Sequence, residues 1–187
     1  MMSLEDKQKK LEEISQEIER CGECRMGKSG QAVPGEGNPG ARIVFVGEAP
    51  GREEAKTGRP FVGRSGKYLV KLLTSIGLKR EDIFITSPVK YFPGRRAPTA
   101  KEIEHGKIHL LKQLAIIQPK IIILLGNVAI RALLGGGISV SQKHGQIIKK
   151  EGVLYFLTFH PAAAIRFPQT RLSMEKDFQK LTQKIKG

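Results

Sequence analysis

The stretch Arg42-Ile43-Val44-Phe45-Val46, followed at once by Gly47-Glu48-Ala49-Pro50-Gly51, decides the fold class. A short continuous run of apolar, mostly β-branched residues is typical of a strand buried on both faces of a sheet. Similar runs occupy residues 83–86, 121–125 and 153–157, and patterns typical of helices occupy residues 65–76, 100–118 and 127–134. Strands that alternate with helices of this length predict a layered α/β fold with a mainly parallel sheet of four strands.

Two further segments precede the first strand. Residues 4–20 place Leu4, Leu11, Ile14 and Ile18 at helical spacing among charged residues, which predicts a helix with one apolar face packed on the core. Residues 25–41 are rich in Gly and Pro, so we expect a surface loop there.

Length and composition limit the class of protein. With 187 residues and 40% apolar content, the chain is expected to form a single domain, residues 1–187, with one core. No apolar run reaches the ~20 residues that span a bilayer, and the acid-rich N-terminus resembles neither a secretory signal nor a transit peptide. We therefore expect a cytoplasmic protein that does not contact membranes.

The charge balance predicts the kind of partner. Lys and Arg number 32 and Asp and Glu 18, so the net charge is +14 and the pI is near 10. This excess is larger than solubility alone requires of a small domain, which favours a polyanionic partner, above all a nucleic acid.

Ligands of parallel sheets bind beyond the carboxyl ends of the strands, and three polar or glycine-rich segments follow predicted strands there. The first segment contains Gly47, Ala49 and Gly51 in a tight loop with exposed backbone N–H groups, together with Glu48 and the nearby acids Glu53 and Glu54. A carboxylate at a strand end can orient a water or stabilise a cationic transition state, and it can equally be a solvated loop acid.

An aromatic ring and a histidine are the other candidates for chemistry. Phe61 lies between Pro and Val in residues 58–66, where it can stack on a base or anchor the core. His160 ends the last predicted strand and opens the small-residue segment 160–166, where it can hydrogen-bond a developing oxyanion or serve a structural role. In the third segment, residues 87–96, Lys and Arg alternate with Pro and Gly. This composition is typical of phosphate-binding loops and equally of charged surface that contacts only solvent.

These motifs, taken in order, resemble the family 4 uracil-DNA glycosylases. The resemblance runs from about Glu12 to the C-terminus and rests on the cysteine pair at 21 and 24, GEAPGREE, TGRPFVGRSG, SPVKYFPGRRAPT and HPAAAIR. It implies a three-layer α/β fold with the sheet between helices. It also implies a monofunctional, monomeric DNA repair enzyme that hydrolyses the N-glycosidic bond of uracil, or of a related deaminated base, and leaves an abasic site.

The resemblance also implies residue roles. Phe61 stacks on the uracil, Glu48 and its loop line the pocket, Glu54 assists the water, and His160 hydrogen-bonds uracil O2. The segment from Ala162 to Arg166 is expected to enter the DNA as a loop. The complete set of implied site residues is, for catalysis, Glu48, Glu54 and His160; for the base, Gly47, Ala49, Gly51, Phe61 and Ser87; and for DNA, Lys90, Arg95, Arg96, His144, Ala164 and Arg166.

The chain departs from the family pattern at two pocket positions. Ser87 stands where the family has an Asn that reads the uracil edge with both a donor and an acceptor, and Ala55 replaces the family's Asp beside Glu54. A hydroxyl cannot reproduce the two-faced contact of an amide. The alternative hypothesis is therefore a glycosylase-derived DNA-binding protein with weak or no catalysis.

The largest departure concerns iron. Family 4 enzymes hold a 4Fe–4S cluster with four cysteines, of which this chain retains Cys21 and Cys24, while Tyr91 and Gly106 occupy the other two positions. We therefore expect no cluster, no metal and no cofactor. His105 and His109 are close enough in sequence to the missing ligand that a zinc site is an alternative, although free thiols are preferred because the spacing is not that of a zinc finger.

Overall fold

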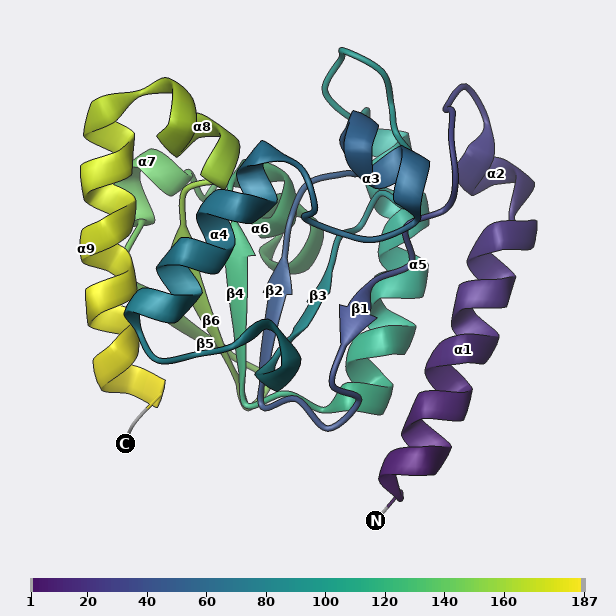
Figure 1. Cartoon of the computed structure of the whole chain (residues 1–187), viewed down its shortest axis with the longest axis horizontal. Coiled ribbons are helices and arrows are strands. Elements are labelled where there is room, and N and C mark those ends of the chain that lie inside the picture. The colour runs from purple at the N-terminus through teal and green to yellow at the C-terminus, as the bar shows by residue number, and fades with distance from the viewer. Residues whose placement is uncertain (1, 186–187) are drawn as a thin grey trace.

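A computed structural model, which describes residues 2–185, has a six-stranded sheet in the order β1-β3-β2-β4-β6-β5 (Figure 1). The predicted α/β class and mainly parallel sheet are confirmed, but the predicted count of four strands is wrong. The four predicted strands are the parallel centre, and two short antiparallel strands flank them. The strands are β1 (Glu36–Gly37), β2 (Ile43–Val46), β3 (Phe84–Thr86), β4 (Ile121–Leu125), β5 (Ile147–Lys150) and β6 (Val153–Thr158).

Helices cover both faces of the sheet and make the three layers. Alternate side chains of β2 point to opposite faces, so that Phe45 joins the apolar cluster under α4, α8 and α9 while Val44 joins the cluster under α5 and α6, with α1 packed against α5. The long helices are α1 (Leu4–Arg20), α4 (Arg64–Ser75), α5 (Ala100–Ile117), α6 (Asn127–Leu134) and α9 (Pro168–Ile185). The four helices predicted from sequence are thus present to within a residue or two at each end.

Short helices complete the connections. Three lie near the carboxyl ends of the parallel strands, and their placement brings polar residues to that edge. They are α3 (Arg52–Thr57), α7 (Val140–Lys143) and α8 (Pro161–Arg166), with α2 (Gly22–Arg25) and the 3₁₀ turn η1 (Arg80–Asp82) elsewhere. The segment 162–166 is therefore helical, which corrects the expected loop: His160 caps the N-terminus and Pro161 occupies the first turn, a strong helix start.

No helix among the described residues is long and apolar enough to cross a membrane. Met1 and residues 186–187 of the predicted domain lie outside the described residues.

Candidate active site

A pocket of about 430 Å³ opens at the carboxyl ends of β2, β3 and β6. Its volume lies in the range of small-ligand sites. All three strand-end segments singled out in the sequence contribute to it. Its lining includes the predicted residues Glu48, Ala49, Gly51, Glu54, Phe61, Ser87, Arg96 and His160.

Gly47 and Glu48 directly follow β2; Glu48 lines the pocket, whereas the predicted base-binding residue Gly47 lies against the Phe61 ring and is not part of the lining. A Cβ on Gly47 would lie 2.7 Å from the ring of Phe61, so only glycine lets that ring lie against the loop. Glu48 is half-buried, and this burial raises the pKa of its carboxyl group. The carboxylate of Glu48 thus borders the pocket in an environment that makes it more basic.

Phe61 is held in a strained turn by two groups. Its φ of 52° is unusual for a bulky residue, and such conformations persist only where neighbouring contacts hold them. Glu54 Oε1 accepts hydrogen bonds from Val62 N at 2.9 Å and Gly63 N at 2.8 Å. The Arg80 guanidinium donates to Phe61 O at 3.1 Å and also to Pro60 O. Glu54 therefore fastens the turn that presents the ring to the pocket.

His160 lies next to Phe61 in the pocket wall, with ring centroids 5.7 Å apart. As the N-cap of α8, His160 accepts a hydrogen bond from Ala162 N at Nδ1, 3.2 Å away. The proton of the neutral ring consequently resides on Nε2, which lies on the Gly47 side. Burial lowers the pKa of His160 to about 4, so at neutral pH the imidazole is an uncharged donor.

Ser87 follows β3 and is buried at the back of the pocket. Its hydroxyl donates to Val89 O at 2.8 Å, which uses its single proton. Towards a ligand Ser87 therefore offers acceptor lone pairs only.

Two of the predicted DNA-binding residues are buried, and these predictions are wrong. Lys90 is 1% exposed, and its ammonium donates to Pro34 O, Thr86 Oγ1 and Gln113 Oε1 at 2.7–3.0 Å. Burial lowers the pKa of Lys90 to about 7, and this group ties loop, strand and helix together inside the protein. Ala164 is fully buried on the inner face of α8, against the core beneath α4 and α9.

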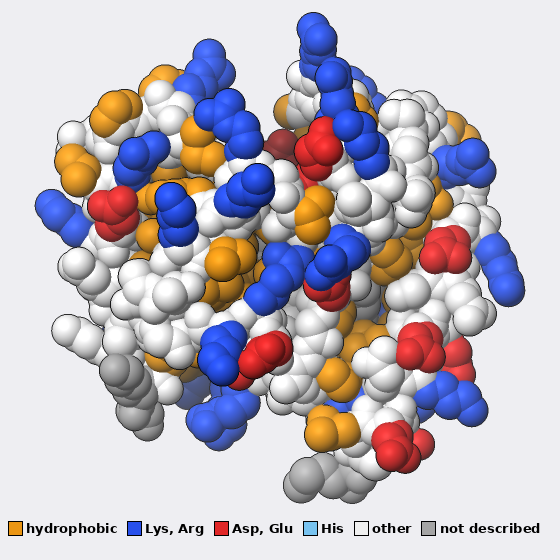
Figure 2. Space-filling model, in the orientation of Figure 1, with side chains coloured by type: hydrophobic (Ala, Val, Ile, Leu, Met, Phe, Trp, Pro, Cys, Tyr) orange, Lys and Arg blue, Asp and Glu red, His pale blue; other side chains and the backbone are white. Residues whose placement is uncertain are grey.

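The other predicted DNA-binding residues lie nearer the surface. Arg95, Arg96 and Arg166 are exposed, and Arg96 forms a two-pronged ion pair with Glu102 at 2.6 and 2.7 Å. His144 is half-buried and bonds Asp177 at 3.0 Å. In Figure 2, Lys and Arg side chains stand on both sides of a hollow at the top of the molecule, near α8 on one side and α3 on the other. Their contact with DNA stays a prediction.

Several residues of the pocket lining were not among the predicted site residues, and three of them have charged or aromatic side chains that suit a nucleic-acid ligand. Arg52, Arg64 and Phe92 line the cavity beside the predicted set. Phe92 sits between Tyr91 and Pro93 in the cationic segment after β3, and an aromatic in such a segment is the signal that identifies it. The two arginines open α3 and α4, and nothing in their local sequence distinguishes them from other surface cations.

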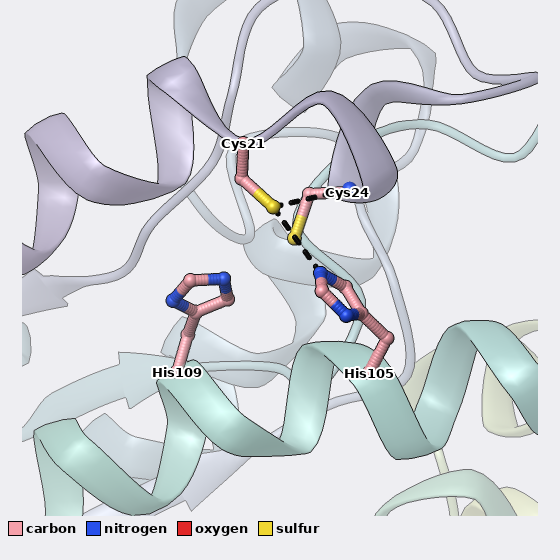
Figure 3. A group of neighbouring side chains, drawn as sticks. All are labelled: Cys21, Cys24, His105 and His109. Atoms are coloured by element: carbon pink, nitrogen blue, oxygen red, sulfur yellow. Dashed lines mark hydrogen bonds between the residues drawn. The ribbon is translucent and has the colours of Figure 1, made fainter.

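A second group of reactive side chains lies at the corner between α1, α2 and α5 (Figure 3). Cys21, Cys24, His105 and His109 point toward one another, and their candidate ligand atoms all lie within 4.8 Å of each other. Cys21 Sγ lies 3.2 Å from His105 Nε2 and accepts a long hydrogen bond from Cys24 N at 3.4 Å. Burial, with Cys21 as a neighbour, raises the pKa of the Cys24 thiol to about 12.

The two positions that replace cysteines do not fit an iron–sulfur cluster. The buried Tyr91 ring packs in the apolar cluster that contains Cys24, and its hydroxyl donates to Glu19 O at 3.3 Å. At Gly106 a Cβ would lie 1.8 Å from Pro88 O. Helix α5 therefore lies too close to the backbone at Pro88 for any residue larger than glycine at this position. A cluster with four thiolates has no third or fourth ligand at these positions.

Comparison with known proteins places this fold and pocket in a family. The family model for the uracil DNA glycosylase superfamily matches residues 34–186. The type-4 uracil-DNA glycosylase of Archaeoglobus fulgidus is 40% identical, over 91% of this chain and 91% of that protein. Its counterpart from Saccharolobus solfataricus is 40% identical over 94% and 86%, and that from Thermotoga maritima is 41% identical over 83% of each. The chain belongs to the uracil-DNA glycosylase superfamily, which confirms the resemblance seen in its motifs.

Proposed function

We propose that this protein removes uracil, or a related deaminated base, from DNA by hydrolysing the N-glycosidic bond. The observation that carries the proposal is the convergence of a neutral imidazole, an aromatic ring and a half-buried carboxylate in one pocket of about 430 Å³. The names of the curated relatives support this substrate.

In the proposed reaction, the target nucleotide leaves the DNA stack and its base enters the pocket against the Phe61 ring. As the bond from C1′ to the base breaks, the base departs with the electron pair and negative charge develops on O2. The N–H of His160 at Nε2 donates to that oxygen. Glu48 orients the water that adds to C1′ and takes its proton, which leaves an abasic sugar.

Base recognition at Ser87 is expected to be one-sided. Because its hydroxyl proton is used by Val89 O, Ser87 can accept from an N–H of the base but cannot donate to the neighbouring carbonyl. Uracil and hypoxanthine both present an N–H beside a carbonyl. This arrangement supports a broader substrate range than a pocket with an amide in this position.

The activity is tested on oligonucleotides that carry a single uracil, hypoxanthine or xanthine, in single- and double-stranded form, followed by alkaline cleavage of abasic sites. We expect strand cleavage at uracil under single-turnover conditions. Salt-sensitive DNA binding without an abasic site at any of these bases would contradict the proposal and favour the non-catalytic alternative.

Substitution of Glu54 tests its positioning role. In Glu54→Ala, the amides of Val62 and Gly63 lose their acceptor and the Phe61 turn loosens, so we expect cleavage to slow by about 10–100-fold, as typical of one lost charge-assisted interaction. Glu54→Gln keeps an acceptor oxygen and is expected to recover most of the rate. If Glu54→Gln is as slow as Glu54→Ala, the carboxylate itself acts on the water, as the family resemblance implies.

We also propose that the chain acts on DNA as a monomeric single domain in the cytoplasm. The single sheet, with helices on both of its faces, supports the single domain. The proposed DNA substrate supports the cytoplasm as the location. Light scattering after size-exclusion chromatography tests the monomer, with a doubled mass as the contrary result.

A further inference from the structure

We propose that Cys21, Cys24, His105 and His109 bind a single Zn²⁺ ion, in place of the iron–sulfur cluster of the related family. The two cysteines flank the start of α2, and the two histidines project from one face of α5, one helical turn apart (Figure 3). A CxxC pair and an HxxxH pair on opposing elements supply the four donors of a tetrahedral structural zinc site.

The geometry suits one ion. Zinc bonds of about 2.3 Å to sulfur and 2.0–2.1 Å to nitrogen imply ligand atoms roughly 3.3–3.8 Å apart in a tetrahedron. The four donors already lie within 4.8 Å of one another, so side-chain adjustments of about 1 Å complete the site. Two thiolates also balance the charge of Zn²⁺, which suits a largely buried position.

His109 is the observation that calls for a ligand. It is 3% exposed, and neither of its ring nitrogens has a hydrogen-bond partner among the described residues. A buried imidazole with both nitrogens unsatisfied costs free energy, whereas a metal bond would satisfy Nε2 and leave the proton on Nδ1, the nitrogen that faces a carboxylate.

A carboxylate stands behind each histidine. Glu23 Oε2 lies 3.3 Å from His105 Nδ1, and Glu17 Oε1 lies 3.5 Å from His109 Nδ1, near that nitrogen but without a formed hydrogen bond. Metal-bound histidines commonly donate their other N–H to a carboxylate, which fixes the tautomer that leaves Nε2 free to bind. His105 shows this orientation, because its Nε2 is the atom that lies 3.2 Å from Cys21 Sγ.

Such a site joins the N-terminal helices to the base pocket. The segment that leaves α2 forms backbone hydrogen bonds from Ser29 N to Phe92 O and from Val33 N to Lys90 O, at 3.2 and 2.8 Å. Phe92 lines the pocket. A metal that holds α2 against α5 therefore also fixes the segment beside the pocket. With two of the family's four cysteines missing, an iron–sulfur cluster cannot provide this link here.

The full chain, without a histidine tag and expressed with zinc and iron both supplied, tests the proposal by elemental analysis and labile-sulfide assay. We expect one zinc per chain, no stoichiometric iron or sulfide, and a melting temperature that falls on chelation and returns with Zn²⁺. Substitution with Co²⁺ is expected to give the visible spectrum of tetrahedral thiolate coordination. Stoichiometric iron with sulfide, or metal-free protein whose melting temperature ignores added Zn²⁺, would overturn the proposal.

Variants then locate the ligands. His109→Ala is expected to lose stoichiometric zinc, and Glu17→Gln to weaken zinc binding by about 10-fold in competition with a chromophoric chelator. Ile108→Ala, an exposed neighbour on the same helix, is the matched control and should retain full zinc content. Unchanged zinc in His109→Ala would place the metal elsewhere. If that variant does not fold, the Co²⁺ spectrum of the unmodified chain decides, because a spectrum without thiolate charge transfer excludes the cysteines.

Discussion

The His160→Ala variant is expected to release uracil about 10²–10³-fold more slowly than the unmodified protein, as loss of one oxyanion donor does in other enzymes. The donor is the Nε2–H of an imidazole that stays uncharged at neutral pH, because burial lowers the pKa of His160 to about 4. DNA binding is expected to change little, since this contact strengthens as charge develops on the leaving base. Single-turnover cleavage rates and equilibrium binding to uracil-containing DNA separate the two effects.

Since His160 also caps α8, the alanine variant loses a structural hydrogen bond at the same time. His160→Asn is the matched control, because asparagine is a strong N-cap whose shorter side chain keeps the cap and does not place a donor where Nε2 lies. We expect its melting temperature to stay near that of the unmodified protein while cleavage remains slow. A His160→Asn variant that cleaves normally would show that His160 acts only as a cap.

The fold illustrates which elements a single sequence can reveal. The four parallel strands were predictable because each is a short run of mainly apolar residues, fully buried in β2, β3 and β4 and buried in the second half of β6. The two edge strands were not: β1 has two residues, and β5 ends in two exposed lysines, so neither carries a periodic signal. The three consecutive alanines of segment 162–166 suggest a loop of small residues, and this prediction is wrong. Alanine is the best helix former and His160 supplies the N-cap, so the segment forms a helix.

At the candidate site, the sequence predicts which strand-end residues line the pocket better than it predicts which cations are exposed. Glu48 and His160 lie just beyond apolar strands, so topology alone brings them to one edge, whereas Phe61 reaches the pocket through the turn between α3 and α4. Lys90 lies four residues before the exposed turn that begins at Gly94, yet its ammonium donates to three internal acceptors, which belong to residues 34, 86 and 113. The proximity of the cysteines and histidines could not be predicted for a related reason. The i,i+4 spacing of the histidines is visible in the sequence, but only the packing of α1 and α2 on α5 shows that they face the cysteines.

Glu48→Gln is expected to lower the cleavage rate by about 10²–10³-fold, which is within the range for loss of a general base. The glutamine has nearly the same shape, so uracil-DNA binding should be retained while the amide fails to take a proton from water. Glu53→Gln is the matched control: this acid on α3 also lines the pocket, but it is exposed and paired with Lys56 at 2.9 Å, so its loss should leave the rate nearly unchanged.

The pH profile identifies the role of the Glu48 carboxylate more directly. Burial raises the pKa of Glu48, and a general base works only when it is deprotonated, so the rate should fall as pH decreases through that raised pKa. The acidic limb should therefore have its midpoint above the usual glutamate value of about 4.3. In Glu48→Gln the remaining slow rate should lose this limb, whereas Glu53→Gln should keep it. An acidic limb that persists unchanged in Glu48→Gln would assign the proton transfer to another group, such as Glu54, whose carboxylate lines the same pocket.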